Sequence, residues 1–444
     1  MDFLKKVIFV FINKQVGFIA DFISSILIVR YLGADEYGYY TTLYLLPILV
    51  SSLGAFGFGP SIVYYINRGS ISIREYLNTF SILGLLLGLV FVMIAISLFE
   101  YINEYFYDGL LKRDLFLISI LFIPAVITQK YLRSIIRGIY EIKVFTILLD
   151  LIQPFMRLVL ILFVFYGDYE LAGIVIIPVV VQITITACMF LYLFKKSSDE
   201  IRTGFIQTSE FVTIARFAFK GYLGAALQKS SSSLIMVIAS ALLTFRDIGI
   251  LSLATKLVGL ISGLSGAIMT VLMPKVSRST ISEIQIYIPR AFSLLLTFNI
   301  IILFIYLIFV DLIVLNVYGE DFLEVSVLSI PLGLAAILLP LCNILLLTLT
   351  FTGDPLKKLY ARGFGLLVNI ALCYPLYFYY GSLGFAIAMG IGQLAIFAMS
   401  LVFFKRKFGD ISLNQLFVFR LADIQFAWKT LKGQLKIKEG ISKT

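Results

Sequence analysis

Six charged side chains stand inside long apolar stretches of the sequence. An ionisable group at bilayer depth costs at least about 2.5–3.5 kcal/mol on insertion scales, so each of the six needs a functional or structural reason. They are Lys14, Asp21, Asp150, Arg157, Lys229 and Lys256. Their net charge of +2 would attract an anionic substrate into a water-filled cavity. A guanidinium suits phosphate in particular, because it donates paired hydrogen bonds.

Four of these side chains are candidate substrate-binding residues. Arg157 and Lys229 fall near the middle of their stretches, one in each half of the chain, so both could face a shared cavity. The alternative is an internal ion pair, for example between Arg157 and Asp150 seven residues earlier. Lys14 and Lys256 lie nearer the ends of their stretches, where a lysine can instead extend its ammonium to the interface.

The two acids are candidate ion-coupling residues for a proton or sodium gradient. Asp21 and Asp150 could equally be the partners of nearby cations. The polar run 228–233 could line a cavity, although Ser and Gln also join transmembrane helices to one another. Candidate hinges are Gly17, Pro47, Pro60 and Pro154, but Gly and Pro are common in transmembrane helices in any case.

Composition excludes several classes of enzyme and indicates a membrane protein. The 444 residues contain no histidine, which removes His-based acid–base relays, nucleophile activation and metal sites. Three cysteines, Cys188, Cys342 and Cys373, lie in apolar stretches without a CxxC pair. We therefore expect no catalytic residue and no metal. With 60% apolar and 14% charged residues, the chain lacks the polar surface of a soluble protein.

The apolar runs predict an all-α integral membrane protein with twelve transmembrane helices, each about 20 residues long. The expected spans are 7–29, 39–65, 77–99, 115–129, 144–166, 171–194, 219–243, 249–273, 291–315, 325–350, 363–380 and 384–404. The fourth span is short and runs into Lys130.

The distribution of cations predicts the orientation. With the N-terminus in the cytoplasm, 28 of the 36 Lys and Arg fall on the cytoplasmic side, 4 on the other side and 4 within spans. Cations are retained on the cytoplasmic side, so we expect a multi-pass protein of the cytoplasmic (inner) membrane with both termini inside. The same bias explains the net charge of +10 without nucleic acid as a partner.

Glycines and prolines recur at a nearly constant offset, which predicts a duplicated unit. Gly38 and Gly249 are 211 residues apart, whereas Pro60 and Pro274, and Gly167 and Gly381, are 214 apart. We expect an N-terminal six-helix bundle in residues 1–200, a parallel C-terminal bundle in 201–404, and a basic amphipathic cytoplasmic tail in 405–444. Parallel repeats of this kind place the substrate path between the two halves.

Several ordered motifs resemble the oligosaccharide flippases of the Wzx type. Residues 28–40 read IVRYLGADEYGYY, Asp247-Ile248-Gly249 precedes the eighth span, Pro274 follows it, and residues 318–322 read YGEDF. This family belongs to the MOP superfamily together with the MATE exporters and the MurJ lipid II flippases, so a MATE-like fold is implied. One departure is the run QKSSSS at 228–233, because the family often has an acidic residue at this place. The ion-coupling role of that acidic residue is therefore not assigned to this chain.

The resemblance implies a transporter that flips a polyprenyl-diphosphate-linked oligosaccharide to the outer leaflet for surface polysaccharide assembly. The expected partners are that substrate, membrane lipids and, as candidates, other polysaccharide assembly proteins. No cofactor is expected beyond a proton or sodium gradient. Alternatives are a MATE-type ion-coupled exporter, which the positive charge balance disfavours, and a membrane glycan polymerase or ligase, which would need a large outer loop. A scaffold without transport is a further alternative.

Overall fold

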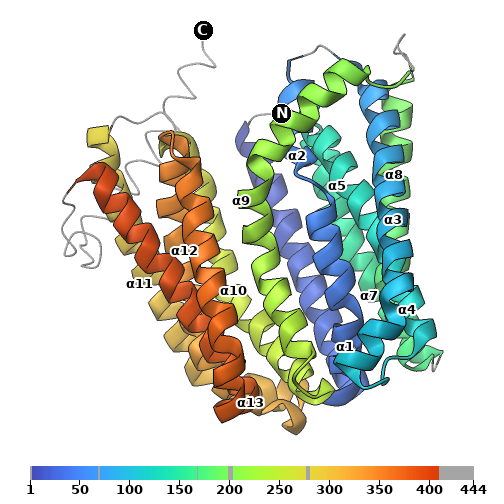
Figure 1. Ribbon diagram of the computed structural model, residues 1–444, viewed down its shortest axis with the longest axis vertical. Coiled ribbons are helices and arrows are strands. Elements are labelled where there is room, and N and C mark those ends of the chain that lie inside the picture. The colour runs from blue at the N-terminus through green and yellow to red at the C-terminus, as the bar shows by residue number, and fades with distance from the viewer. Residues whose placement is uncertain (1–2, 69–70, 168, 199–203, 277–280, 410–444) are drawn as a thin grey trace. The chain divides into compact units, whose positions relative to one another are not determined.

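The computed structural model describes residues 3–68, 71–167, 169–198, 204–276 and 281–409, and it consists of helices (Figure 1). No β-strand occurs among these residues, so the expected all-α class is confirmed. The helices are α1 (Phe3–Gly54), α2 (Phe58–Ile66), α3 (Ile73–Tyr107), α4 (Arg113–Ile120), α5 (Phe122–Gly138), α6 (Ile142–Thr146), the π-helix η1 (Ile147–Ile152), α7 (Gln153–Tyr166), α8 (Glu170–Lys196), α9 (Thr208–Ser240), α10 (Phe245–Val276), α11 (Ile281–Ile313), η2 (Val314–Tyr318), η3 (Glu320–Phe322), α12 (Glu324–Phe351) and α13 (Pro355–Phe408).

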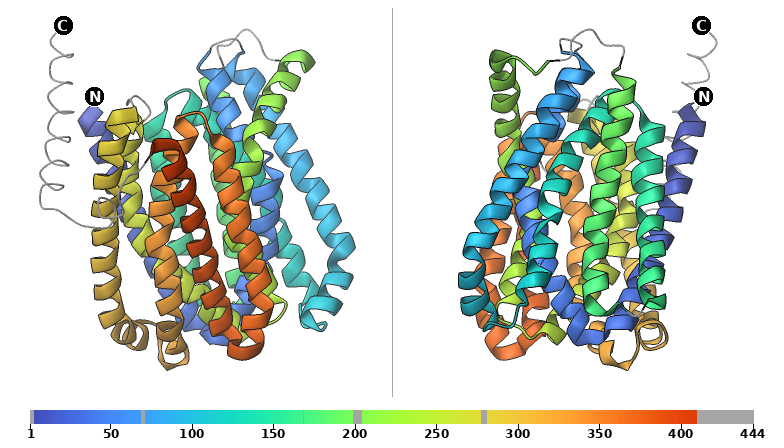
Figure 2. Two further views of the ribbon diagram at one scale, coloured as in Figure 1. Left: turned by 60° about the vertical axis from the view of Figure 1, so that its left-hand side comes forward. Right: turned by 90° about the vertical axis from the view of Figure 1, so that its right-hand side faces the viewer.

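The helices pack into two compact units. Unit 1 comprises Met1–Ser252 and Val317–Asp321, and unit 2 comprises Leu253–Asn316 and Phe322–Thr444. In unit 1, α5 packs against α3 and α8, while α1 packs against α7 and α9. In unit 2, α12 packs against α11 and α13. Within each unit the long helices run roughly side by side (Figure 2). The expected division into residues 1–200 and 201–404 stays a prediction.

Length and surface chemistry both identify membrane-spanning helices. Eight stretches among the described residues are long and apolar enough to cross a membrane. Large apolar side chains such as Met93, Phe304 and Phe378 are exposed on their outer faces, which suits contact with lipid. Two of the eight stretches, in α1 and α13, each hold two expected spans. When these are separated and α9 and α10 are added, the described residues form twelve helical segments.

The two double spans bend at single glycines. Gly33 in α1 has φ 69° and Gly381 in α13 has φ 55°, in the left-handed region that favours glycine. The connections expected around residues 30–38 and 381–383 are therefore sharp breaks, and helix resumes directly after each. Gly167, which the repeat aligns with Gly381, lies at the corresponding break between α7 and α8.

The second expected span, 39–65, is not continuous. α1 ends at Gly54, residues 55–57 form a turn, and α2 begins at Phe58. Pro60 explains the position of the break, because it has no N–H to donate to the carbonyl of Phe56 and its ring would clash there. Phe56 and Gly57 accordingly have positive φ angles of 43° and 70°.

Three side chains hydrogen-bond to carbonyls at the break, of which those of Leu53 and Ala55 also accept the N–H of the residue three positions later. The donors are Lys130 and Tyr131 from α5 and Tyr222 from α9. Their acceptors are the carbonyl oxygens of Ser51 (2.7 Å), Ala55 (3.3 Å) and Leu53 (2.6 Å), respectively. The ammonium of Lys130 also suits the negative end of the α1 dipole. These three hydrogen bonds therefore stabilise the break between α1 and α2.

The fourth span is longer than expected. Residues 115–129 were predicted, but the helical stretch runs over Arg113–Gly138. Arg133 and Arg137, which follow the expected span, lie on the last turns of α5. The expected end at residue 129 was wrong because an apolar run ends at the first charge, whereas helical hydrogen bonding continues. The leucine and isoleucine side chains of this segment are buried and keep it helical.

The aligned glycines Gly38 and Gly249 contact each other in unit 1. A Cβ on Gly38 would collide with the carbonyl oxygen of Phe245 and lie 2.9 Å from the backbone nitrogen of Gly249. Conversely, a Cβ on Gly249 would lie 3.0 Å from the backbone nitrogen of Gly38. The second helical segment of the first half and α10 therefore cross backbone to backbone at equivalent positions of the repeat.

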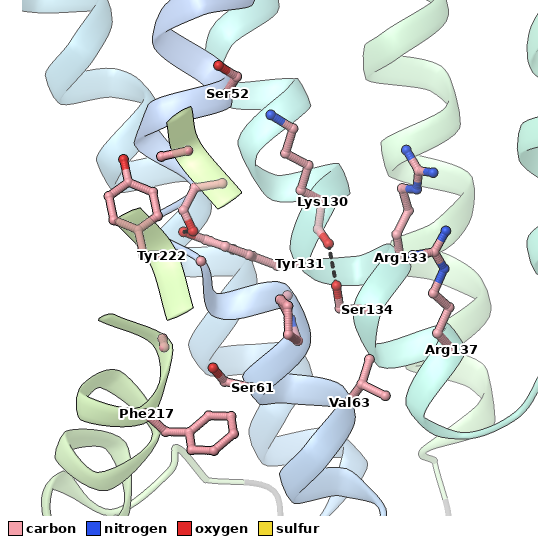
Figure 3. A pocket seen from close by; sticks show the side chains of 16 residues that line it. Ser52, Ser61, Val63, Lys130, Tyr131, Arg133, Ser134, Arg137, Phe217 and Tyr222 are labelled. Carbon is pink, nitrogen blue, oxygen red and sulfur yellow. Dashed lines mark hydrogen bonds between the residues drawn. The ribbon is translucent and has the colours of Figure 1, made fainter. Parts of the chain in front are cut away.

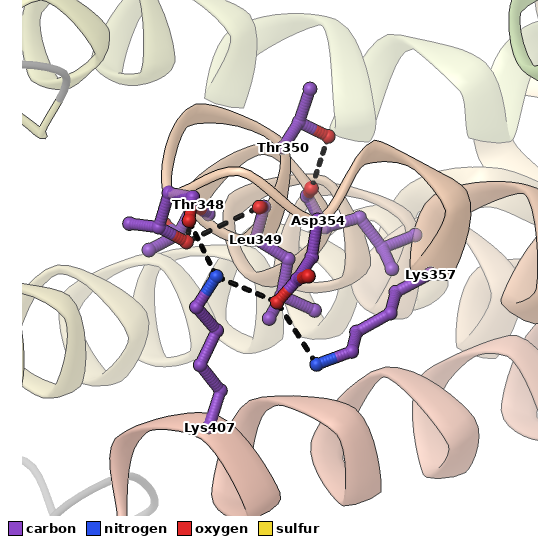
Figure 4. A network of polar contacts seen from close by, with 8 residues as sticks. Thr348, Leu349, Thr350, Asp354, Lys357 and Lys407 are labelled. Carbon is purple, nitrogen blue, oxygen red and sulfur yellow. Dashed lines mark hydrogen bonds and ion pairs between the residues drawn. The ribbon is translucent and has the colours of Figure 1, made fainter.

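Unit 2 has a polar network at the turn between α12 and α13 (Figure 4). Asp354 Oδ2 accepts hydrogen bonds from Nζ of Lys407 at 2.6 Å and of Lys357 at 3.0 Å. Lys407 also donates to the carbonyl oxygen of Thr352 at 2.6 Å. The network ties the last turn of α13 to its first. The hydrogen bond from Lys407, followed by that from Lys357, holds the pKa of Asp354 below its ordinary value of 3.8.

We expect Asp354→Asn to lower the thermal stability of the purified protein in a pH-dependent way. Because the folded-state pKa is lowered, the stabilisation is fully present above the ordinary pKa and is lost as pH falls through the folded value. The melting temperatures of the parent and the variant should therefore differ equally at pH 7 and pH 5 and converge below about pH 4. Glu104→Gln, at an exposed carboxylate, is the control. A constant difference down to pH 3 would contradict the assignment.

Candidate functional site

Two charged pairs face each other across α1 and the segment formed by η1 and α7. Lys14 and Asp21 are seven residues apart on α1, and Asp150 and Arg157 are seven apart on the neighbouring segment. Arg157 donates from Nη1 to Oδ1 of Asp21 at 2.8 Å. Asp150 is attracted electrostatically by Lys14. Unlike charges thus lie opposite each other at two successive levels.

Arg157 forms an internal ion pair, the alternative considered for it, but its partner is Asp21 and not Asp150. In a regular α-helix, residues seven apart share a face. The π-helix over Ile147–Ile152 has i→i+5 hydrogen bonds and changes the angular relation between Asp150 and Arg157. Pro154 accounts for this irregularity, because it has no N–H to donate to the carbonyl of Asp150 four residues before it.

Gly17 allows α1 to approach the π-helix closely. It lies between Lys14 and Asp21 and is buried. A Cβ at this position would collide with the carbonyl oxygen of Asp150 and lie 3.3 Å from Cγ of Pro154. Small residues commonly mark such close helix crossings in membranes. The contact brings both charged pairs within reach of each other.

The Arg157–Asp21 pair remains accessible. Its side chains are 32% and 44% exposed, so neither charge is sealed in a protein core. The charge of Arg157 also acts on the phenol of Tyr40, which contacts Tyr37 and Tyr44 through their rings. Tyr40 was missed in the sequence analysis, because nothing in its spacing distinguishes it from other tyrosines of the span.

The other predicted site residues are not brought into this cluster. Lys229 lies on α9, but its side chain is outside the part of the structure that is described. Lys256 lies on α10 in unit 2, with an exposed side chain. Asp311, near the end of α11, is a third acid within the expected spans and lowers their charge balance from +2 to +1. The predicted basic amphipathic tail lies outside the described residues from residue 410 onward.

A cavity of about 450 Å³ lies in unit 1 beside the helix break (Figure 3). Residues from the end of α1, α2, α5 and α9 line it, among them Gly59 and Ser61 of α2 and Tyr222 of α9. Lys130, Arg133 and Arg137 of α5 contribute three positive charges. Figure 3 shows the guanidiniums of Arg133 and Arg137 next to each other, with Lys130 one turn away.

The two guanidiniums lack close acidic partners. Neither Arg133 nor Arg137 forms an ion pair with another described residue, although the charge of Asp150 attracts both electrostatically. Their Cζ atoms lie 5.5 and 4.5 Å from the centre of the Phe145 ring. The spacing of positions 130, 133 and 137 could have revealed this face, because three and four residues separate neighbours on a helix.

Several solved structures share the fold of this chain. The lipid II flippase MurJ, in an inward closed conformation, matches with a TM-score of 0.73 and 18% identity over 93% of this chain and 91% of that chain. An inward-facing multidrug resistance MATE family transporter of the MOP superfamily gives 0.67 and 14% over 89% and 94%. A MOP superfamily transporter from Pyrococcus furiosus, described by a binding pocket of reverse polarity, gives 0.63 and 14% over 91% and 95%.

The chain therefore shares its fold with a lipid II flippase and with transporters of the MOP superfamily. In sequence, residues 3–280 match the family described as polysaccharide biosynthesis protein. The chain belongs to this family. None of the curated proteins matches it in sequence.

We expect Gly17→Ala to destabilise the protein by about 1–3 kcal/mol, because the added methyl group collides with backbone and not with a movable side chain. Thermal unfolding of the purified protein measures the effect. Gly259→Ala is the matched control, since an added Cβ there meets no atom within 4 Å. Helix propensity predicts an unchanged or higher stability for this control. Equal stability of the two variants would refute the close crossing.

Proposed function

We propose that this protein flips a polyprenyl-diphosphate-linked oligosaccharide from the cytoplasmic to the outer leaflet for assembly of a surface polysaccharide. The family supports polysaccharide biosynthesis as the setting. The fold it shares with a lipid II flippase supports movement of a lipid-linked substrate. Alternating access between two helical bundles is the proposed mechanism. The cation bias of the sequence supports a cytoplasmic-membrane location with both termini inside.

The observation that carries the proposal is the accessible Arg157–Asp21 pair at membrane depth. A scaffold has no need of such a pair, because apolar residues of similar volume often stabilise a protein equally well or better. A diphosphate can replace Asp21 as the partner of Arg157, since both offer oxygen acceptors to the same guanidinium. Lys14, Lys229 and Lys256 remain proposed contacts to the diphosphate or to acidic sugars.

Asp21 and Asp150 are the proposed coupling residues. A substrate anion that takes over Arg157 leaves Asp21 without its cation, and a proton or sodium ion can then compensate its charge. Substrate binding and ion binding at this pair are thereby linked. The linkage needs no cofactor beyond the ion gradient.

A MATE-type exporter of small molecules is the second candidate function, because MATE transporters share the fold. The charge balance over the spans distinguishes the two functions. It is positive even with Asp311 included, and a positive cavity favours an anionic substrate over a cationic drug. A glycan polymerase or ligase has no comparable support.

We expect Arg157→Gln to reduce transport of a labelled lipid-linked oligosaccharide in proteoliposomes by at least about tenfold, since a charged hydrogen bond to phosphate is lost. The double substitution Asp21→Arg/Arg157→Asp exchanges the two charges and distinguishes a role of Arg157 in substrate binding from a role in stability. It restores the ion pair and should recover thermal stability, but not transport. Full recovery of transport would show that Arg157 has only a structural role. Arg30→Gln, at an exposed cation of α1, is the control.

Lys229→Ala should abolish surface polysaccharide in cells while leaving the amount of protein in the membrane unchanged. The physical reason is loss of the cation proposed to face the substrate from α9. Glycan staining together with an immunoblot of the protein measures both quantities. Normal glycan in this variant would remove Lys229 from the proposed site.

A further inference from the structure

We infer that Arg133 and Arg137, in the cavity bounded by α2, α5 and α9, bind the phosphate of a lipid headgroup. The cavity is separate from the Arg157–Asp21 pair, and the inference does not depend on which substrate the protein transports. Its volume of about 450 Å³ falls within the range of roughly 300–1,000 Å³ that is typical of ligand pockets.

The charges of the two arginines call for an anion. Arg133 and Arg137 are four residues apart on one helix, and like charges at this spacing repel each other. Asp150 acts on both only from beyond ion-pair distance. Lys130, by contrast, donates to the carbonyl of Ser51 and so has a structural contact. No described ion pair compensates the charge of either guanidinium.

Groups on the opposite wall also suit an anion. The first turn of α2 lines the cavity, and α2 has no side-chain cap at its N-terminus. Helix N-termini attract phosphate through their dipole and free N–H groups, although in α2 the N–H of Phe58 already donates to the carbonyl of Ala55 and Pro60 has no N–H. Independently, Ser61 is a lining residue that is only 1% exposed, and its hydroxyl has no hydrogen-bond partner among the described residues. This hydroxyl can donate a hydrogen bond to a phosphate oxygen once its side chain turns toward the cavity.

The depth of the cavity favours a lipid over a free anion. Arg133 and Arg137 lie on the last turns of the 26-residue membrane-spanning stretch Arg113–Gly138. At 1.5 Å per residue this stretch is about 39 Å long, so its end reaches the headgroup region of a bilayer. Basic pockets between helices at this level suit anionic headgroups. Val63, Phe217 and Ala218 supply apolar walls for the start of an acyl or prenyl chain.

Two lipids share this chemistry: the diphosphate of a polyprenyl carrier and the phosphodiester of an anionic phospholipid. Thermal unfolding of the full-length protein in neutral detergent distinguishes them. The probes are inorganic diphosphate, farnesyl diphosphate and phosphatidylglycerol, with phosphatidylcholine as the zwitterionic control. Stabilisation by farnesyl diphosphate above that by phosphatidylglycerol identifies a carrier-lipid site. The reverse order identifies a phospholipid site, and either order supports the inference.

The decisive comparison uses Arg133→Gln/Arg137→Gln in the Arg157→Gln background, so that diphosphate bound at the proposed transport site does not contribute. We expect the pair of substitutions to weaken diphosphate binding by about tenfold or more. The matched control Lys143→Gln/Arg216→Gln removes the same charge from exposed positions that do not line the cavity and should bind like the background.

Unchanged binding in the Arg133→Gln/Arg137→Gln variant would overturn the inference. If that variant does not fold, Arg133→Lys/Arg137→Lys keeps both charges but loses the paired guanidinium hydrogen bonds, and its affinity should still fall measurably. Equal affinity of the lysine variant and the background would then overturn the inference. Because binding is measured without transport, its outcome is independent of the result for the proposed flippase function.

Discussion

A charge within a membrane must meet an opposite charge or water, and this constraint organises unit 1. On α1 a cation precedes an anion by seven residues, and on the adjacent segment an anion precedes a cation by the same number. Lys14 therefore lies toward Asp150 at one level, and Asp21 pairs with Arg157 at the next. The opposite order of charge on the two segments neutralises each level locally. A displacement of one helix along the other by two turns, about 10.5 Å, would place like charges together.

Close backbone contact makes this arrangement possible. Helices in a bilayer gain little from the hydrophobic effect on association, so packing of small residues must hold them together. Gly17 meets the carbonyl of Asp150, which Pro154 leaves without its usual helical donor. The same residues thus create the irregular turn, expose its carbonyl and allow α1 to approach it. Gly38 and Gly249 form a second crossing of this type, which shows that unit 1 relies on small residues at more than one level.

Most of the fold could be predicted from the sequence, because apolar length and glycine breaks leave direct traces in it. Twelve helical segments were expected, and the breaks at Gly33 and Gly381 fall within or beside expected connections. The partner of Arg157 could not be predicted, since it depends on a π-turn that changes which residues share a face. The cations after Gln129 recur at helical spacing, so the helical position of Arg133 could have been predicted, but the apolar run that defined the span ends at Lys130. The lack of an ion pair at the Arg133 guanidinium among the described residues could not be predicted from the sequence.

Asp150 connects the two charged regions of unit 1. Its carboxylate is attracted by Lys14 on α1 and by Arg133 and Arg137 on α5. An anion held by the two arginines competes with Asp150 for their positive charge, because attraction between charges weakens with distance and with compensation by closer partners. Asp150 is then left with Lys14 as its principal cation. A headgroup bound at the helix break would therefore change the electrostatic balance where α1 crosses the π-helix. This crossing is one level from the Arg157–Asp21 pair, so the ligand need not contact that pair.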